Sequence, residues 1–162
     1  MFSIAIRRLF EFAETQKDHR LPRPVKLIFD DFSCGVPIQQ FDKSISIFRE
    51  AGISALMLCQ SISQLSATYG EQCASTIMDN CSSITYFPGG LNKQTCLYIG
   101  ELMNVPLEDV LFMPLGQVIV IQSGQKPIIS DRYDTRSDPL FEIFMSYSKN
   151  FDKHIEKEES VA

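Results

Sequence analysis

Short apolar runs alternate with helical patterns along this sequence, and that alternation constrains its fold more than any other feature. The runs lie at residues 25–30, 53–59 and 83–87. Between the first two, residues 38–51 carry apolar side chains at spacings of three and four, the period of a helix with one buried face; these are Ile38, Phe41, Ile45 and Phe48. Strands separated by helices predict an α/β fold in which crossover helices join the strands of a parallel sheet.

The remaining elements follow from the same patterns. Further helices are predicted at residues 2–17, at 61–68, in a segment ending near residue 80, in a segment that begins at Asn92 or near Thr95 and reaches residue 103, and at 139–151. Ser61 is expected to cap the helix that follows it, and Gly52 is expected to end the helix 38–51. Residues 117–121 and 127–130 suggest a hairpin around a Ser-Gly-Gln turn. We therefore expect one domain over residues 1–151 and a charged, flexible tail over 152–162.

Composition excludes several classes of protein. The net charge of −5 argues against an autonomous nucleic-acid-binding surface, which is normally basic. The five cysteines are odd in number and form no Cys-x-x-Cys, which argues against a disulfide framework or a zinc site. The sequence shows neither a signal peptide nor an apolar stretch of membrane-spanning length. A reducing, cytoplasmic location fits this composition.

Polar side chains follow the first two predicted strands. Asp30 and Asp31 come directly after the first, and the carboxyl ends of strands are where open α/β sheets bind ligands. Two carboxylates there can hold a hydrated Mg²⁺ and polarise a water molecule, as the Walker B element of a nucleoside triphosphatase does. Gln60 follows the second strand, where an amide can orient an attacking water or contact a γ-phosphate. No Gly-Lys pair occurs, so the phosphate loop G-x-x-x-x-G-K-[ST] is absent from the sequence.

Each of these residues also has an ordinary structural interpretation. Two acids after a strand occur in solvated turns and at helix caps, and an amide can cap a helix. Arg49, near the end of the helix 38–51, either complements the helix dipole or acts as an arginine finger on a neighbouring subunit's nucleotide. His19 and His154 lie far apart in polar segments, which argues against a histidine-based site. The residues alone leave catalytic and structural roles open.

The order and spacing of these pieces resemble one known family over roughly residues 5–135. The matching stretches are Lys26-Leu-Ile-Phe-Asp-Asp-Phe, Ile38-x-x-Phe41-x-Lys43, Phe48-Arg-Glu-Ala-Gly-Ile-Ser, Gln60-Ser-Ile-Ser-Gln-Leu, Tyr69-Gly70, Ile77-Met-Asp-Asn-Cys, Gly89-Gly90 and residues 95–102. In this order they resemble the TraG/TraD-type coupling ATPases of type IV secretion and conjugative DNA transfer. The stretch from Gln60 to Leu65, followed by Tyr69-Gly70, is the most specific part.

This resemblance implies a partial RecA-like P-loop NTPase domain that lacks the Walker A half. By position, Asp30 would ligate Mg²⁺ through water, and Asp31 would also face the metal and activate water. Gln60 falls on the family's glutamine after the next strand, facing the nucleotide. Arg49 falls on an arginine thought to act across a subunit boundary.

The family also implies cofactors, partners and a location. Its members use ATP and Mg²⁺, and we expect neither to bind tightly to this chain alone. They are membrane-anchored homo-hexamers at the cytoplasmic face of the bacterial membrane. Their partners are relaxosome–DNA complexes and components of the type IV secretion channel. No membrane segment is expected in this chain.

The sequence departs from the family pattern at several points. Asp31 is one methylene shorter than the family's usual glutamate, and Cys34 takes a place often held by asparagine. The membrane segment, phosphate-loop half and inserted helical domain have no counterpart, so we expect the C-terminal part of a coupling protein, inactive alone. Two other interpretations stay open. One is a non-catalytic interaction module for secretion substrates or relaxosome components. The other is an unrelated α/β enzyme that uses Asp30 and Asp31 for metal-assisted hydrolysis.

Overall fold

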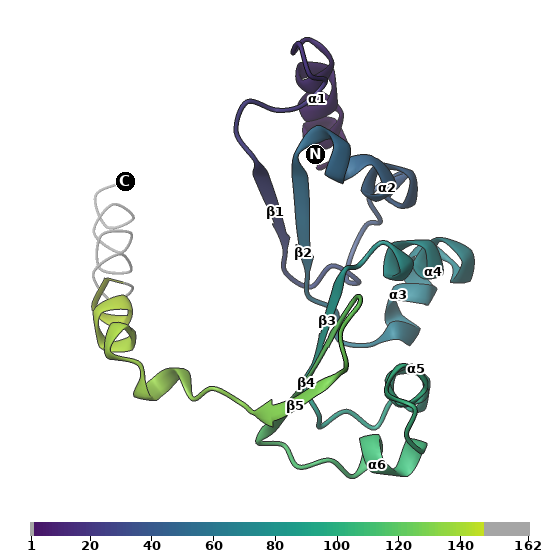
Figure 1. Ribbon diagram of the computed structural model, residues 1–162, viewed down its shortest axis with the longest axis vertical. Coiled ribbons are helices and arrows are strands. Elements are labelled where there is room, and N and C mark those ends of the chain that lie inside the picture. The colour runs from purple at the N-terminus through teal and green to yellow at the C-terminus, as the bar shows by residue number, and fades with distance from the viewer. Residues whose placement is uncertain (1, 148–162) are drawn as a thin grey trace, which may run out of the picture. The chain divides into compact units, whose positions relative to one another are not determined.

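A computed structural model describes residues 2–147, and Figure 1 shows the order of their helices and strands. The chain divides into two compact units, Met1–Ile129 and Ser130–Ala162. The elements are α1 (Phe2–Glu14), β1 (Val25–Phe29), α2 (Phe41–Ala51), β2 (Ile53–Met57), α3 (Ile62–Tyr69), α4 (Glu71–Asp79), β3 (Ser83–Tyr86), α5 (Lys93–Met103), α6 (Leu107–Leu111), β4 (Gln117–Gln122), β5 (Ile128–Asp131) and a 3-10 helix, Thr135–Ser137. Residues 139–147 are also helical. β5 crosses the boundary between the two units.

β1 and β2 form a parallel pair, which confirms the predicted α/β class. Val25 lies opposite Ile53 and Phe29 opposite Met57. Parallel neighbours need a crossover connection, and α2 supplies it. The helix buries one face, formed by Phe41, Ile45, Phe48 and Ala51. Gly52 ends it in the left-handed conformation, with φ 79°, as the sequence predicts.

The third predicted strand joins a different sheet. β3 pairs antiparallel with β4, and the order of this second sheet is β3-β4-β5. Along β3, half-buried and exposed residues alternate, which suits an antiparallel sheet with one covered face. Ile84 lies opposite Ile121 and Tyr86 opposite Ile119. These four side chains face the same apolar cluster, which explains the pairing. The predicted neighbours β4 and β5 are confirmed.

The apolar interior of the first unit consists of two clusters. The larger is built from α1, β1, α2, β2, α3 and α4, and its centre includes Phe41, Leu65 and Ile77. The smaller is built from the β3–β4 pair, α5 and α6 around Cys96 and Ile119. Figure 1 shows β1 and β2 close to α1 and α2, and β3 and β4 on the side of α5 and α6. The site described below belongs to the larger cluster.

Several predicted boundaries shift. α2 begins at Phe41 rather than at Ile38, because Gln40 takes a left-handed conformation, with φ 55°. α1 ends at Glu14. α6, which has only five residues, was not predicted from the sequence. Of the helix predicted at 139–151, residues 139–147 are helical and the rest lies outside the described residues, as does the predicted tail from 152.

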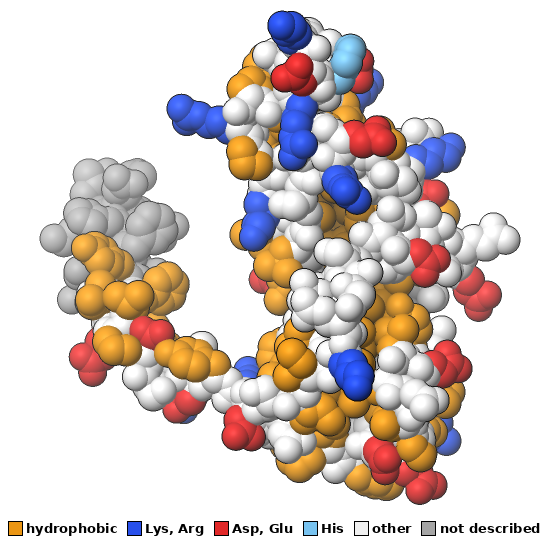
Figure 2. Space-filling view, in the orientation of Figure 1, with side chains coloured by type: hydrophobic (Ala, Val, Ile, Leu, Met, Phe, Trp, Pro, Cys, Tyr) orange, Lys and Arg blue, Asp and Glu red, His pale blue; other side chains and the backbone are white. Residues whose placement is uncertain are grey.

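Charged and apolar side chains are unevenly spread over the surface. Figure 2 shows that lysines and arginines gather near α1 and the β1–β2 pair, whereas hydrophobic side chains are prominent over β3, β4 and α5. Exposed apolar residues also occur on the parallel pair, where Ile28 and Leu56 are 64% and 50% exposed. Among the described residues, no helix combines the length and apolar character needed to cross a membrane.

Candidate functional site

The acid pair, Asp30 and Asp31, directly follows the last residue of β1. Phe29 closes the strand, and its carbonyl oxygen accepts a hydrogen bond from Leu58 N–H at 2.9 Å. The Phe32 N–H then donates to the Leu58 carbonyl oxygen at 2.8 Å. These two bonds hold the segments that leave β1 and β2 side by side beyond the sheet. Asp30 and Asp31 are therefore exposed at the carboxyl edge of the parallel pair, the edge at which such sheets bind ligands.

Asp31 occupies an unusual backbone conformation. Its φ of 48° is left-handed, a region that aspartate and asparagine enter more readily than other non-glycine residues. A tight turn supports it, since Cys34 N–H donates to the Asp31 carbonyl oxygen at 2.8 Å. The Asp31 N–H in turn donates to Asp30 Oδ1 at 3.1 Å. This conformation favours the aspartate of this chain over the longer glutamate that is usual at this position in the family it resembles.

Gln60 meets the acid pair from the neighbouring chain segment. It lies three residues beyond β2, and its Nε2 donates to Asp31 Oδ1 at 3.3 Å. Ser61, the next residue, caps α3 by accepting from Gln64 N–H at 3.1 Å, as the sequence predicts. The structure therefore brings together three of the four predicted site residues, Asp30, Asp31 and Gln60.

Arg49 lies at the opposite end of the parallel pair. It belongs to the last turn of α2, which ends at Gly52. The Gly52 carbonyl oxygen accepts from the N–H of Val25, the first residue of β1, at 3.1 Å, whereas the acids follow the last residue. The exposed Arg49 side chain forms no ion pair with the described residues. Within one chain, Arg49 and the acid pair do not meet.

The loop after the acids is hydrogen-bonded to α3, a contact that was not predicted from the sequence. Ser33 is the one polar residue that is buried among those described, with 2% exposure. Its Oγ donates to Gln64 Oε1 at 3.1 Å, and its carbonyl oxygen accepts from Thr68 Oγ1 at 2.7 Å. The spacing of Gln64 and Thr68 could have indicated this contact, because residues four apart share one face of a helix.

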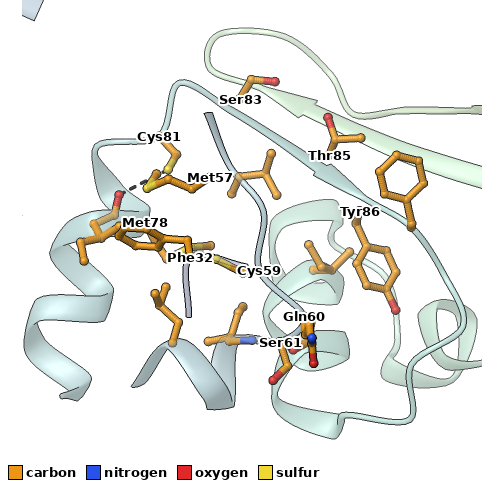
Figure 3. Close-up of a pocket in the computed structure, with 17 residues that line it drawn as sticks. Phe32, Met57, Cys59, Gln60, Ser61, Met78, Cys81, Ser83, Thr85 and Tyr86 are labelled. Atoms are coloured by element: carbon orange, nitrogen blue, oxygen red, sulfur yellow. Dashed lines mark hydrogen bonds between the residues drawn. The ribbon is translucent and has the colours of Figure 1, made fainter. Parts of the chain in front are cut away.

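A mainly apolar pocket of about 230 Å³ lies beside Gln60. Figure 3 shows Gln60 and Ser61 at one end and Met57, Met78 and Cys81 at the other, with Tyr86 across from them. Burial raises the pKa of the Cys81 thiol. Burial likewise raises the pKa of Cys59, against a smaller opposing effect of a hydrogen bond with Ser33. Thiols with raised pKa values are poor nucleophiles at neutral pH, so the pocket offers apolar surface rather than a catalytic cysteine.

The chemistry of the acid pair fits one hard divalent cation. Mg²⁺ is usually held by one or two carboxylates, several waters and substrate phosphates, and Asp30 and Asp31 are two exposed carboxylates. Within the described part of the chain, no group of three or more His, Cys, Asp or Glu residues forms a fuller cage. His19 instead contacts Glu14, and His154 lies outside the described residues.

Residues 24–103 match a family model described as the TraM recognition site of TraD and TraG. This segment is therefore of the TraG/TraD type. The TraG/TraD-type segment includes the acid pair, Gln60 and the whole of α3. A search of curated proteins finds no match.

Solved coupling proteins share the TraG/TraD-type fold of this chain. The bacterial conjugative coupling protein TrwBdeltaN70 in complex with sulphate aligns with a TM-score of 0.67 and 16% identity, over 86% of this chain and 38% of its own. The plasmid coupling protein TrwB in complex with the ATP analogue ADPNP gives 0.66 and 15%, over 86% and 37%. TrwB in complex with ADP and Mg²⁺ gives 0.64 and 15%, over 85% and 37%. The chain thus spans less than two fifths of the length of these structures.

Proposed function

We propose that this chain supplies the Mg²⁺-binding and water-positioning edge of a nucleotide site in a conjugative DNA-transfer coupling protein. The observation that carries the proposal is the hydrogen bond between Gln60 Nε2 and Asp31 Oδ1, 3.3 Å long, at the carboxyl edge of the parallel pair. The TrwB structures with ADPNP and with ADP and Mg²⁺ support it, because those coupling proteins share this fold.

Each site residue then has a distinct task. Asp30 holds Mg²⁺ through water, and Asp31, beside it, accepts a proton from the attacking water. The Gln60 amide, already directed at Asp31, orients that water. When bound, Mg²⁺ neutralises charge that develops on the phosphate oxygens. Because the sequence has no Gly-Lys pair, the phosphate cradle would come from another polypeptide segment, and ATP would bind weakly to this chain alone.

The proposed assembly is a homo-hexamer at the cytoplasmic face of a membrane. It would act on relaxosome–DNA complexes and pass them to a type IV secretion channel. The position of Arg49 supports this arrangement. An arginine at the far end of the sheet is too distant to act on its own acid pair, and an arginine finger acts in trans on another subunit's nucleotide.

A metal-binding experiment tests the proposal directly. Mn²⁺, a paramagnetic substitute for Mg²⁺, should broaden the amide NMR signals of residues 29–34 and 58–61 and leave those of α6 sharp. The double variant Asp30→Asn/Asp31→Asn should lose this broadening, because both anionic ligands are gone. Asp109→Asn, which removes an exposed carboxylate on α6, is the matched control and should retain it. Uniform weak broadening that is unchanged in the double variant would contradict the proposal.

A second candidate function is recognition of a partner without turnover. The description of the matching family, a TraM recognition site, favours it. In this role the chain would bind a relaxosome protein of the TraM type through its folded surface. Calorimetric titration with such a protein separates the two functions. Binding that survives Asp30→Asn/Asp31→Asn, together with no selective Mn²⁺ effect, would support recognition and exclude the metal site.

A further inference from the structure

The three residues after the acid pair form a strap, Phe32–Cys34, that lies along one face of α3. The Phe32 ring stacks on Tyr69 with centroids 5.1 Å apart and an interplanar angle of 16°. Ser33 is bound from both sides, by Gln64 at 3.1 Å and by Thr68 at 2.7 Å. Cys34 Sγ accepts from Gln64 Nε2 at 3.2 Å. Every residue of the strap therefore has its own contact with α3.

The same helix also fixes the other member of the site. Gln60 immediately precedes Ser61, the residue that caps α3. The start of α3 thus determines where Gln60 lies, and the face of α3 determines where the strap lies. Asp31 is joined to the strap by the turn in which Cys34 N–H donates to its carbonyl oxygen. The Asp31–Gln60 hydrogen bond consequently joins two segments whose positions are both set by α3.

Two features indicate that the position of Asp31 depends on the strap. Its left-handed backbone is costly for a residue with a side chain, so the turn would relax if the strap were released. Its bond to Gln60 joins two exposed side chains, and a single exposed hydrogen bond contributes too little to impose a geometry. The buried contacts of Ser33 are the stronger constraint, because a buried hydroxyl or carbonyl without a partner is unfavourable.

We propose that Gln64 and Thr68 are positioning residues that hold Asp31 within hydrogen-bonding distance of Gln60. The inference rests on the proposed function in one respect: this alignment matters for turnover only if Asp31 and Gln60 act on water. The alignment of the two side chains is itself independent of metal. Gln64 acts through both Ser33 and Cys34, and Thr68 acts through the Ser33 carbonyl group.

The test uses a pair of substitutions at one position of the full chain. Thr68→Val keeps the shape but removes the hydroxyl that binds Ser33, whereas Thr68→Ser retains that hydroxyl. Thr76→Val is the matched control, because the Thr76 hydroxyl binds only the Gln72 carbonyl group within α4. The first readout is the Gln60 side-chain amide signal in NMR spectra, with Asp31→Ala as the reference for a lost hydrogen bond. The second is hydrogen exchange at the Cys34 amide.

In Thr68→Val, we expect the Gln60 side-chain signal to move most of the way to its position in Asp31→Ala. Exchange at the Cys34 amide should rise about tenfold, while exchange at the Leu58 amide, which donates to the Phe29 carbonyl oxygen, stays near wild type. Thr68→Ser should restore both readouts, and Thr76→Val should change neither. Gln64→Leu should behave like Thr68→Val.

Two results would overturn the proposal. One is a Gln60 signal that stays at its wild-type position in both Thr68→Val and Gln64→Leu. The other is an exchange increase spread evenly over the first unit, which would mean that α3 supports only global stability. Neither readout requires a metal ion. A wild-type chain that fails to bind Mn²⁺ would therefore refute the proposed function and leave this inference to be decided by the Gln60 signal.

Discussion

At the scale of single residues, the backbone conformation at position 31 and the chemistry of the site both favour an aspartate. The left-handed region is open to glycine, asparagine and aspartate, and it is unfavourable for glutamate. A carboxylate at this point must therefore be short, and it reaches Gln60 without the additional methylene. The departure from the family's usual glutamate is, in this chain, consistent with the local backbone.

Substitutions of Asp31 should separate backbone strain from charge. Asp31→Glu should lower the free energy of unfolding by about 1 kcal/mol, because a longer side chain is less compatible with φ 48°. Asp31→Asn should be close to neutral in stability, since Oδ1 remains to accept from Gln60, but should weaken Mn²⁺ binding by losing a charge. Urea unfolding and a Mn²⁺ titration measure the two effects. An Asp31→Glu variant as stable as wild type would refute the argument from strain.

At the scale of secondary structure elements, Tyr86 on β3 should give the second sheet a pH dependence. Burial, and then its hydrogen bond with Cys96, raise the pKa of Tyr86 from 10.0 to about 12. The phenol is therefore more readily ionised in the unfolded chain. Its contribution to stability is fully present below pH 10 and is lost as the pH rises towards about 12.

Absorbance at 295 nm should record this step, and unfolding experiments across the same pH range should record the loss of stability. Tyr86→Phe should remove this tyrosine's contribution to the step and make the loss of stability between pH 10 and 12 smaller. Tyr147→Phe is the control, because that tyrosine is 71% exposed. A titration of all tyrosines as one group near pH 10 would contradict the prediction.

Elements that depend on a few neighbouring residues were predictable from the sequence. The apolar spacing from Phe41 to Phe48 predicted α2, Gly52 predicted its end, and Ser61 predicted the start of α3. The partner of β3 was not predictable, because pairing with β4 depends on contacts between distant segments such as Ile84 and Ile121. The strap was missed for the same reason: Ser33 and Gln64 are 31 residues apart. The proximity of Gln60 to Asp31 was predicted because strand order fixes it.

At the scale of the whole molecule, the parallel pair has an exposed apolar face. Ile28 and Leu56 are register partners, so they lie on the same face, and each is at least half exposed. Parallel sheets are normally covered on both faces. We therefore expect the isolated chain to self-associate as its concentration rises, which sedimentation velocity can measure. Ile28→Glu with Leu56→Glu should reduce association, whereas Val36→Glu, in an exposed loop, should not. A monodisperse monomer at all concentrations would argue against this prediction.

The isolated chain should not hydrolyse ATP. Its sequence offers no Gly-Lys pair for the β- and γ-phosphates, and without such a cradle the acid pair has no nucleotide to act on. A steady-state phosphate-release assay is sufficient. Turnover that disappears in Asp30→Ala would instead favour the third interpretation of the sequence, an enzyme that uses the acid pair alone.

Arg49 should matter only when subunits assemble. Its side chain is exposed at the far end of the parallel pair from Asp31, so Arg49→Ala should change the stability of the isolated chain by less than about 1 kcal/mol, the size of a helix-dipole effect. In a longer coupling protein with a phosphate loop, the same substitution should reduce turnover by about 10³-fold or more and leave ATP affinity nearly unchanged.

Mixing subunits distinguishes an action in trans from a local role of Arg49. A subunit with Arg49→Ala still carries an intact acid pair, and a subunit with Asp30→Ala still carries the arginine. If each site combines residues from two neighbours, some mixed interfaces are complete, and a mixture of the two inactive variants should recover part of the activity. If the mixture gains nothing although both variants assemble with wild-type subunits, Arg49 acts within its own chain, as a helix-terminal charge and no more.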